Sequence, residues 1–217
     1  MRMQYLWLLG LLIPACLSVY AVKTGKYRFK IAVTPSCMLL MAAALIARGR
    51  TVPGFLLLIG ALGFSIVGDS FLSFREGRKN FYLYGIACFF CAHVLYLCYV
   101  LAKSGSVLSS SVLTCILAVL ATGYYVLRLY RHAGSPLMKA ALYVYLFISC
   151  VTFSFTIFAG TGLAEQILLT IGIGLILFSD LCIGETDFAG NPRVKEWILP
   201  TYYLAHMLIT ASVLAAI

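Results

Sequence analysis

Charged residues are scarce in this chain. Asp, Glu, Lys and Arg make up 11% of its 217 residues, whereas hydrophobic residues make up 63%, and the mean hydropathy is +1.01. A soluble domain is about half apolar and about a quarter charged, so this scarcity excludes an ordinary soluble domain. The long apolar runs are typical of helices that cross a bilayer, which need about 20 residues each. The composition predicts an all-α, multi-pass membrane protein.

Familiar catalytic and nucleotide-binding signatures are also missing. The chain has no GxSxG, no HExxH and no P-loop motif, which argues against the common serine hydrolases, zinc proteases and nucleotide-dependent enzymes. Cys88 and Cys91 with His93 imitate a metal site, but no second ligand pair follows at the spacing that structural zinc prefers. We expect the eight cysteines to be packing residues. The sequence predicts no metal and no cofactor.

The net charge of +9 comes from basic residues in short loops between apolar segments. Such residues record membrane topology and contact anionic lipids, so we expect membrane lipids and no nucleic acid as partners. Eight segments are long and apolar enough to span a membrane within a single domain, 1–217. They lie at about 3–22, 31–47, 54–73, 81–102, 106–127, 137–159, 164–183 and 197–217.

The distribution of Lys and Arg predicts the orientation. The loops after the first, third, fifth and seventh segments hold 12 of the 16, and the opposite side holds 4. Because positively charged loops stay on the inner side of the membrane, both termini should face the outer side. If the source is bacterial, we expect the protein in the inner membrane. The same count favours a retained span at 3–22 over a cleaved signal peptide.

Two halves of the chain resemble each other. Asp69 is followed by His93 after 24 residues, and Asp180 is followed by His206 after 26. Two similar sets of four spans would be related by an axis along the membrane normal. The pattern predicts a central cavity, open to the inner face, with the two acids at equivalent depths. The halves run over about 1–103 and 104–217.

The two isolated acids are the main candidates for function. A carboxylate inside a span is costly unless it faces protein, water or a partner, and its default interpretation is functional. Asp69 and Asp180 lie about three to four residues from the inner ends of their spans, roughly 5–7 Å deep. Two carboxylates beside a cavity suit a reaction in which one donates a proton and the other activates water. The structural alternative is pairing with a nearby cation such as Arg75, or capping of a backbone group.

Other polar residues share helical faces with the acids. In the last span Tyr202, His206 and Thr210 form one stripe, with Tyr203 beside it, while His93 lies close to the midplane of its span. We expect Tyr202, Tyr203, His206 and His93 to bind or orient a substrate. A histidine in a span is also often an interhelical hydrogen bonder, and that alternative remains open.

Four short motifs, in this order and spacing, resemble the YhhN-type lysoplasmalogenases over nearly the whole chain. The motifs are G-D-x-x-L at 68–72, A-H-x-L-Y at 92–96, S-D at 179–180 and Y-Y-L-A-H at 202–206. The resemblance implies eight spans and hydrolysis of the vinyl ether bond of lysoplasmalogens. The products would be a fatty aldehyde and glycerophosphoethanolamine or glycerophosphocholine, and the partner a lysophospholipid.

Two positions depart from the family pattern, and one of them is His206 in the last span, where Gln would be expected as readily. Members tend to begin the second span with Lys-Pro, whereas this chain has Thr34 and Pro35. Lys30, one turn earlier, could present its charge from the same face and is our candidate for the phosphate contact.

The chemistry that the resemblance implies parallels glycoside hydrolysis, because both reactions pass through an oxocarbenium-like cation next to oxygen. The sequence predicts that Asp69 and Asp180 share the acid and base roles, and that either Asp→Asn change lowers turnover about a hundredfold or more. Two other functions remain open: a proton-coupled carrier of a small amphiphile or lysolipid, and a structural protein without chemistry.

Overall fold

The computed structural model describes residues 6–24, 41–47, 52–74, 79–103, 107–159 and 162–215. These residues contain no β-strand, which confirms the predicted all-α fold. Residues 41–47 are helical. The other elements are α1 (Leu6–Lys23), α3 (Phe55–Ser73), α4 (Lys79–Leu101), α5 (Val107–Tyr124), the π-helix η2 (Tyr125–Leu129), α6 (Pro136–Thr156), α7 (Leu163–Asp187), the 3₁₀-helix η3 (Pro192–Val194) and α8 (Lys195–Ala215).

The helices follow the apolar segments closely. The segment predicted at 54–73 is helical from Phe55 to Ser73, and α7 runs past its predicted end to Asp187. Within the described residues, six helices are long and apolar enough to cross a membrane, namely α3, α4, α5 with η2, α6, α7 and α8 with η3. The predicted segment 31–47 lies mostly outside the described residues. Eight spans and the outward-facing termini therefore stay predictions.

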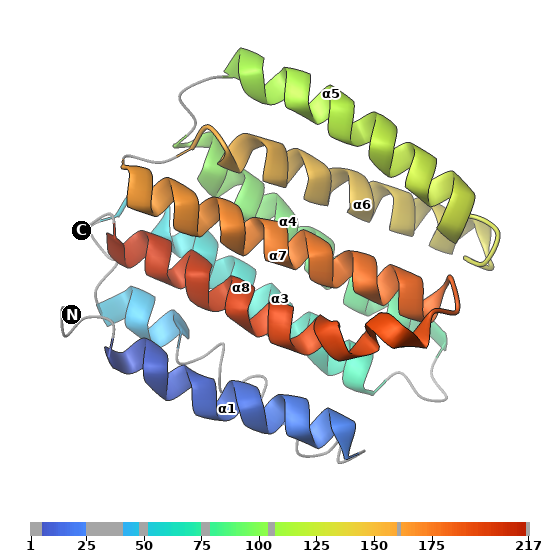
Figure 1. Ribbon diagram of the computed structural model, residues 1–217, viewed down its shortest axis with the longest axis horizontal. Helices are drawn as coiled ribbons and strands as arrows, with labels where there is room; N and C mark the ends of the chain where they lie inside the picture. Colours follow the sequence, from blue (N-terminus) through green and yellow to red (C-terminus); the bar gives the residue numbers. More distant parts are fainter. Residues whose placement is uncertain are drawn as a thin grey trace.

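The helices lie side by side in a bundle (Figure 1). The most extensive packing joins α3 to α4 and α7 to α8, while α6 contacts α4, α5 and α7, and α1 contacts α8. One end of the bundle holds the start of α1 and the end of α8, and the opposite end holds the last turns of α3, α5 and α7 (Figure 1). The division into two repeated halves remains a prediction.

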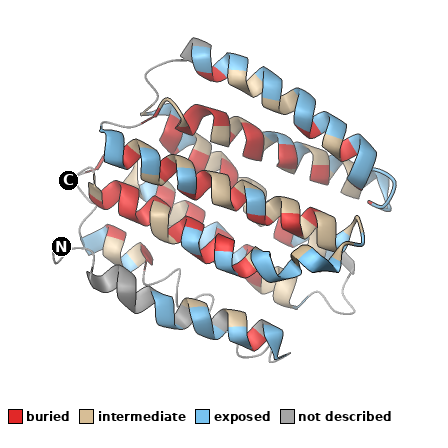
Figure 2. Cartoon of the chain, viewed as in Figure 1, coloured by how far each residue is buried: buried red, intermediate tan, exposed pale blue. Residues whose placement is uncertain are grey.

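Burial distinguishes a central helix from a peripheral one. In an apolar stretch of 18 residues within the span that includes α8, 67% of the residues are buried, compared with 17% in the corresponding stretch of the span that includes α5, and Figure 2 shows this contrast. The exposed side chains of α5 include Val112, Ile116 and Val119. An exposed apolar helix suits contact with lipid, so α8 forms the core and α5 an outer wall.

Two glycines allow the helix pairs to approach closely. A Cβ at Gly68 of α3 would lie 3.0 Å from the Phe89 ring of α4, and a Cβ at Gly172 of α7 would lie 2.7 Å from Ile209 of α8. Small residues permit this approach between membrane helices. The Gly68 contact matters for the site, because it places an aromatic ring directly beside Asp69.

Candidate active site

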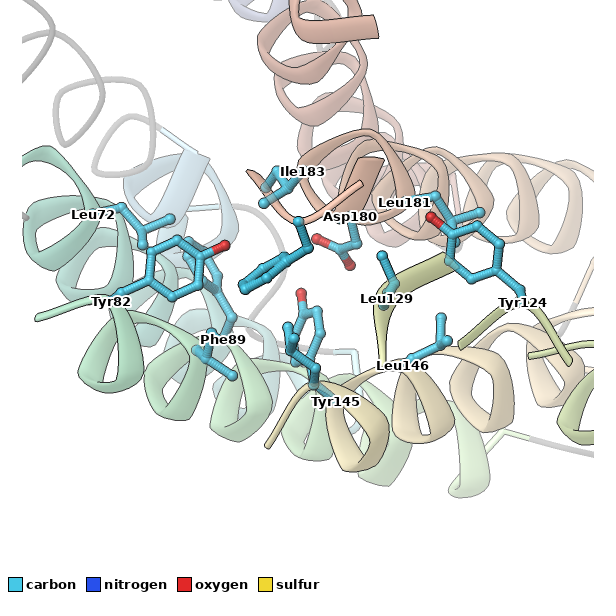
Figure 3. A pocket seen from close by; sticks show the side chains of 14 residues that line it. Leu72, Tyr82, Phe89, Tyr124, Leu129, Tyr145, Leu146, Asp180, Leu181 and Ile183 are labelled. Carbon is cyan, nitrogen blue, oxygen red and sulfur yellow. The ribbon is translucent and has the colours of Figure 1, made fainter. Parts of the chain in front are cut away.

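A pocket opens at the end of the bundle where α3, α5 and α7 finish. Its empty volume is about 590 Å³, counting the open mouth. Apolar side chains form most of the wall, and of the described residues that line it only Asp180 carries a charge. Figure 3 shows Asp180 in the middle of the pocket, with Phe89 and Tyr82 to one side and Leu129 and Tyr124 to the other.

The Asp180 carboxylate is held from two neighbouring helices. Its Oδ2 lies 3.2 Å from Nε2 of His93 on α4. The same nitrogen lies 3.1 Å from the Tyr145 hydroxyl and 3.4 Å from Oγ of Ser149, both on α6. In Figure 3 the Tyr145 hydroxyl points toward the carboxylate. Asp180 also lines the pocket, so its carboxyl group can meet a molecule there.

The residue before Asp180 explains its direction. Ser179 is fully buried and its hydroxyl donates to the backbone carbonyl of Ile198 in α8, at 2.9 Å. Successive residues of a helix point about 100° apart, at 3.6 residues per turn. Since Ser179 faces α8, Asp180 turns away from it toward α4 and α6, where His93 and Tyr145 meet it.

Asp69 has a different environment. It is only 8% exposed, and its Oδ2 accepts a hydrogen bond of 2.9 Å from the Tyr202 hydroxyl of α8. Asp69 is not part of the pocket wall, whereas Phe89 is. The rings of Phe89 and Tyr202 meet edge to face, with centroids 6.3 Å apart. Tyr202 therefore links Asp69 to Phe89, which lines the pocket.

The remaining predicted site residues are His206, Tyr203 and Lys30. His206 is buried, and its Nδ1 lies 2.9 Å from the Tyr96 hydroxyl, while its ring packs on Tyr202 at 4.6 Å. Tyr203 is also buried and its ring meets Tyr202 at 5.6 Å. Lys30 lies outside the described residues. The structure thus brings His93 to Asp180 and Tyr202 to Asp69, with His206 and Tyr203 around Tyr202.

The comparisons with known proteins add one finding. The model of the YhhN family matches residues 29–213, a range that includes the candidate acids Asp69 and Asp180 and the candidate histidines His93 and His206. The chain belongs to the YhhN family. This confirms the family resemblance that the four sequence motifs indicated. Neither the curated proteins nor the solved structures contain a match.

In this YhhN-family chain the cysteines stay apart from the histidine. His93 faces Asp180, Tyr145 and Ser149, although Cys88 and Cys91 lie on the same helix. Throughout the described ranges, no three His, Cys, Asp or Glu side chains gather closely enough to hold a metal ion.

The sequence analysis missed the contribution of α6. Tyr145 and Ser149 both contact His93, yet neither was a candidate. A signal was present, because Tyr145, Ser149 and Thr152 recur at i, i+4 and i+7 in an otherwise apolar segment, and residues at this spacing share one face of a helix. Tyr96, the partner of His206, belongs to the A-H-x-L-Y motif but was likewise not singled out.

Proposed function

We propose that this chain is an integral membrane hydrolase that cleaves the vinyl ether bond of lysoplasmalogens. The products would be a fatty aldehyde and glycerophosphoethanolamine or glycerophosphocholine. The observation that carries the proposal is the position of Asp180, the one charged side chain in the described wall of an apolar pocket. Membership of the YhhN family supports it.

The reaction needs one proton donor and one water molecule. A proton adds to the outer vinyl carbon, and the inner carbon becomes an oxocarbenium cation stabilised by the ether oxygen. Water then adds to that carbon and loses a proton, which gives a hemiacetal. The hemiacetal hydroxyl then loses its proton to form the aldehyde as the bond between this carbon and the ether oxygen breaks, and the ether oxygen takes up a proton and leaves as the free glycerol hydroxyl. One water is consumed overall, as in glycoside hydrolysis.

Asp180 is the proposed donor. Its carboxyl group lines the pocket and would face the vinyl carbon, while Oδ2 is held near Nε2 of His93. After the proton has left, an N–H on His93 stabilises the new carboxylate, since hydrogen bonds to charged groups are about twice as strong as neutral ones. The same carboxylate then faces the cation and accepts a proton from the attacking water.

Asp69 has a supporting role in this proposal. Because it is not part of the pocket wall and Tyr202 links it to Phe89, which is, Asp69 acts through Tyr202 rather than by contact with the substrate. Its negative charge also favours a developing cation in the pocket, and this attraction is stronger in a medium of low dielectric constant. The two acids therefore share the work unequally.

The test uses purified protein in detergent. Aldehyde should be released from a vinyl ether lysophospholipid and not from the matched alkyl ether lysophospholipid, which has no double bond to protonate. Asp180→Asn should abolish the release while the protein stays folded. Absence of aldehyde in detergent, together with proton-dependent lysolipid movement in sealed vesicles, would instead establish the carrier.

A further inference from the structure

A second polar network lies next to the pocket, and Tyr124 belongs to both. Glu185 of α7 is 16% exposed, and Arg128 of η2 is 50% exposed. The guanidinium donates from Nε to Oε1 at 3.1 Å and from Nη2 to Oε2 at 2.7 Å. The Tyr124 hydroxyl donates to Oε1 at 3.1 Å, and the Asn191 side-chain amide donates to Oε2 at 3.4 Å. The network joins the end of α5 to the end of α7.

A π-turn produces this arrangement. The backbone N–H of Tyr130 bonds to the carbonyl of Tyr125, five residues earlier, at 2.8 Å. In an α-helix residues five apart point about 140° away from each other, but a π-turn brings them to one side. Tyr124 and Leu129 consequently both line the pocket, and Arg128 precedes Leu129 in the same π-turn. Single π-turns in helices are frequent at functional sites.

Glu185 and Arg128 differ in how many of their hydrogen-bonding positions are occupied. A carboxylate offers about four acceptor positions, and four donors occupy those of Glu185. A guanidinium has five N–H donors, of which two bond to Glu185. The other three have no partner within the described residues. Glu185 is thus saturated and holds Arg128 in place, while Arg128 retains donors for an anion.

The separation along α7 matches one class of substrate. Glu185 follows Asp180 by five residues, which is about 7.5 Å along the helix axis. In a lysoplasmalogen seven bonds connect the outer vinyl carbon to the phosphorus atom, and an extended chain of that length spans roughly 8 Å at the reach of about 3.5 Å per three bonds. The axial separation is comparable with that reach, and Gly184 and Tyr124, which adjoin Glu185 in the chain and by a hydrogen bond, line the same pocket as Asp180.

We propose that Arg128, held by Glu185, binds the phosphate of a glycerophospholipid whose ether chain occupies the pocket. This inference rests on the proposed function for the position of the vinyl bond, and it adds a determinant of specificity. The Arg128 fork matches phosphate geometry. The enzyme then requires a phosphate on the glycerol carbon distal to the ether, whichever amine the headgroup carries.

The test measures equilibrium binding in detergent, without any need for turnover. One probe is an alkyl ether lysophosphatidylethanolamine, which cannot be hydrolysed, and the other is the alkylglycerol of the same chain length. Arg128→Gln should weaken binding of the phosphate-bearing probe about tenfold or more, since a hydrogen bond to a charged group is lost, and should leave the alkylglycerol unchanged. Arg131→Gln is the matched control, because Arg131 is an exposed cation close by in sequence.

The outcomes separate the alternatives. An equal loss for both probes, no loss for either, or the same loss in Arg131→Gln would overturn the assignment. Tight binding of glycerol 3-phosphate alone would also overturn it, in favour of a free-phosphate site. If Arg128→Gln does not fold, Arg128→Lys decides, with the expectation of weaker binding to the phosphate probe only. If the protein binds the phosphate-bearing probe through Arg128 but does not cleave the vinyl ether, the phosphate site stands and the proposed reaction is refuted. If it cleaves the vinyl ether but Arg128→Gln binds both probes as the unchanged protein does, the reaction stands and the phosphate site is refuted.

Discussion

Asp180 and Asp69 occupy matching places in two similar stretches of sequence, but they meet different surroundings. Asp180 lies in the wall of a pocket, with one oxygen held beside His93. Asp69 is only 8% exposed and accepts a hydrogen bond from Tyr202, whose ring meets Phe89. The same type of side chain thus faces a pocket at one position and is enclosed at the other.

The residue before each acid accounts for much of this difference. Gly68 has no side chain, so Phe89 packs closely against α3 beside Asp69. Ser179 donates to a carbonyl of α8 and turns Asp180 toward the pocket. A repeat in sequence therefore does not imply two equivalent sites. The environment of a carboxylate, rather than its motif, decides which chemistry it can perform.

The strongest test of the comparison is removal of the Asp180 acid. Asp180→Asn keeps the size and shape of the side chain but removes the proton donor, and general acid catalysis contributes about 10²–10⁴-fold. We expect aldehyde release to fall about a hundredfold or more, with an unchanged elution profile in detergent. Retention of more than about a tenth of the activity would mean that Asp180 is structural.

The two histidines provide a matched pair for the next test. His93 contacts Asp180, whereas His206 contacts Tyr96 and packs on Tyr202. His93→Gln should lower turnover by a factor of a few tens, because the hydrogen bond to the ionised Asp180 is weakened. His206→Gln should lower it only a few times. Equal losses in the two variants, measured with the same substrate, would show that the halves contribute alike.

A smaller effect is expected at the enclosed acid. Asp69→Asn and Tyr202→Phe should each lower turnover by less than about tenfold, because neither side chain touches the substrate. A double-mutant cycle on thermal or denaturant unfolding should give a coupling of about 1–2 kcal/mol, as two residues in direct hydrogen-bond contact are not independent. A hundredfold loss of turnover in Asp69→Asn would instead restore the equal roles that the sequence predicts.

The smallest effects on activity should come from two glycines of α7. A Cβ at Gly172 would lie 2.7 Å from Ile209 on the tightly packed α8 side, whereas a Cβ at Gly184 would lie 3.5 Å from Leu129 on the pocket side. Gly172→Ala should lower the free energy of unfolding by about 1–3 kcal/mol through overpacking, and Gly184→Ala by about 0.5 kcal/mol or less. A reversed order of melting temperatures would show that the pocket side is the denser one.

Some features follow from local sequence alone. Helix positions such as Phe55–Ser73 and Lys79–Leu101 could be predicted because a span must be long and apolar, which is visible in one segment at a time. The two acids stood out for the same reason, since a lone carboxylate is conspicuous among apolar residues. Family membership could also be predicted, because four short motifs in a fixed order can be recognised in the sequence alone.

Partners across the bundle could not be predicted, since they depend on how helices rotate and pack. That His93 of one half meets Asp180 of the other, through α4, α6 and α7, depends on the rotation of three helices at once. Lys103 illustrates the same limit, because by sequence it is a loop charge and in the structure it pairs with Glu165, both nearly inaccessible. Sequence composition and periodicity determined which residues enter the membrane and which are chemically unusual there. Only the tertiary structure decided which acid faces a pocket, because exposure is a property of the neighbours that close over a side chain.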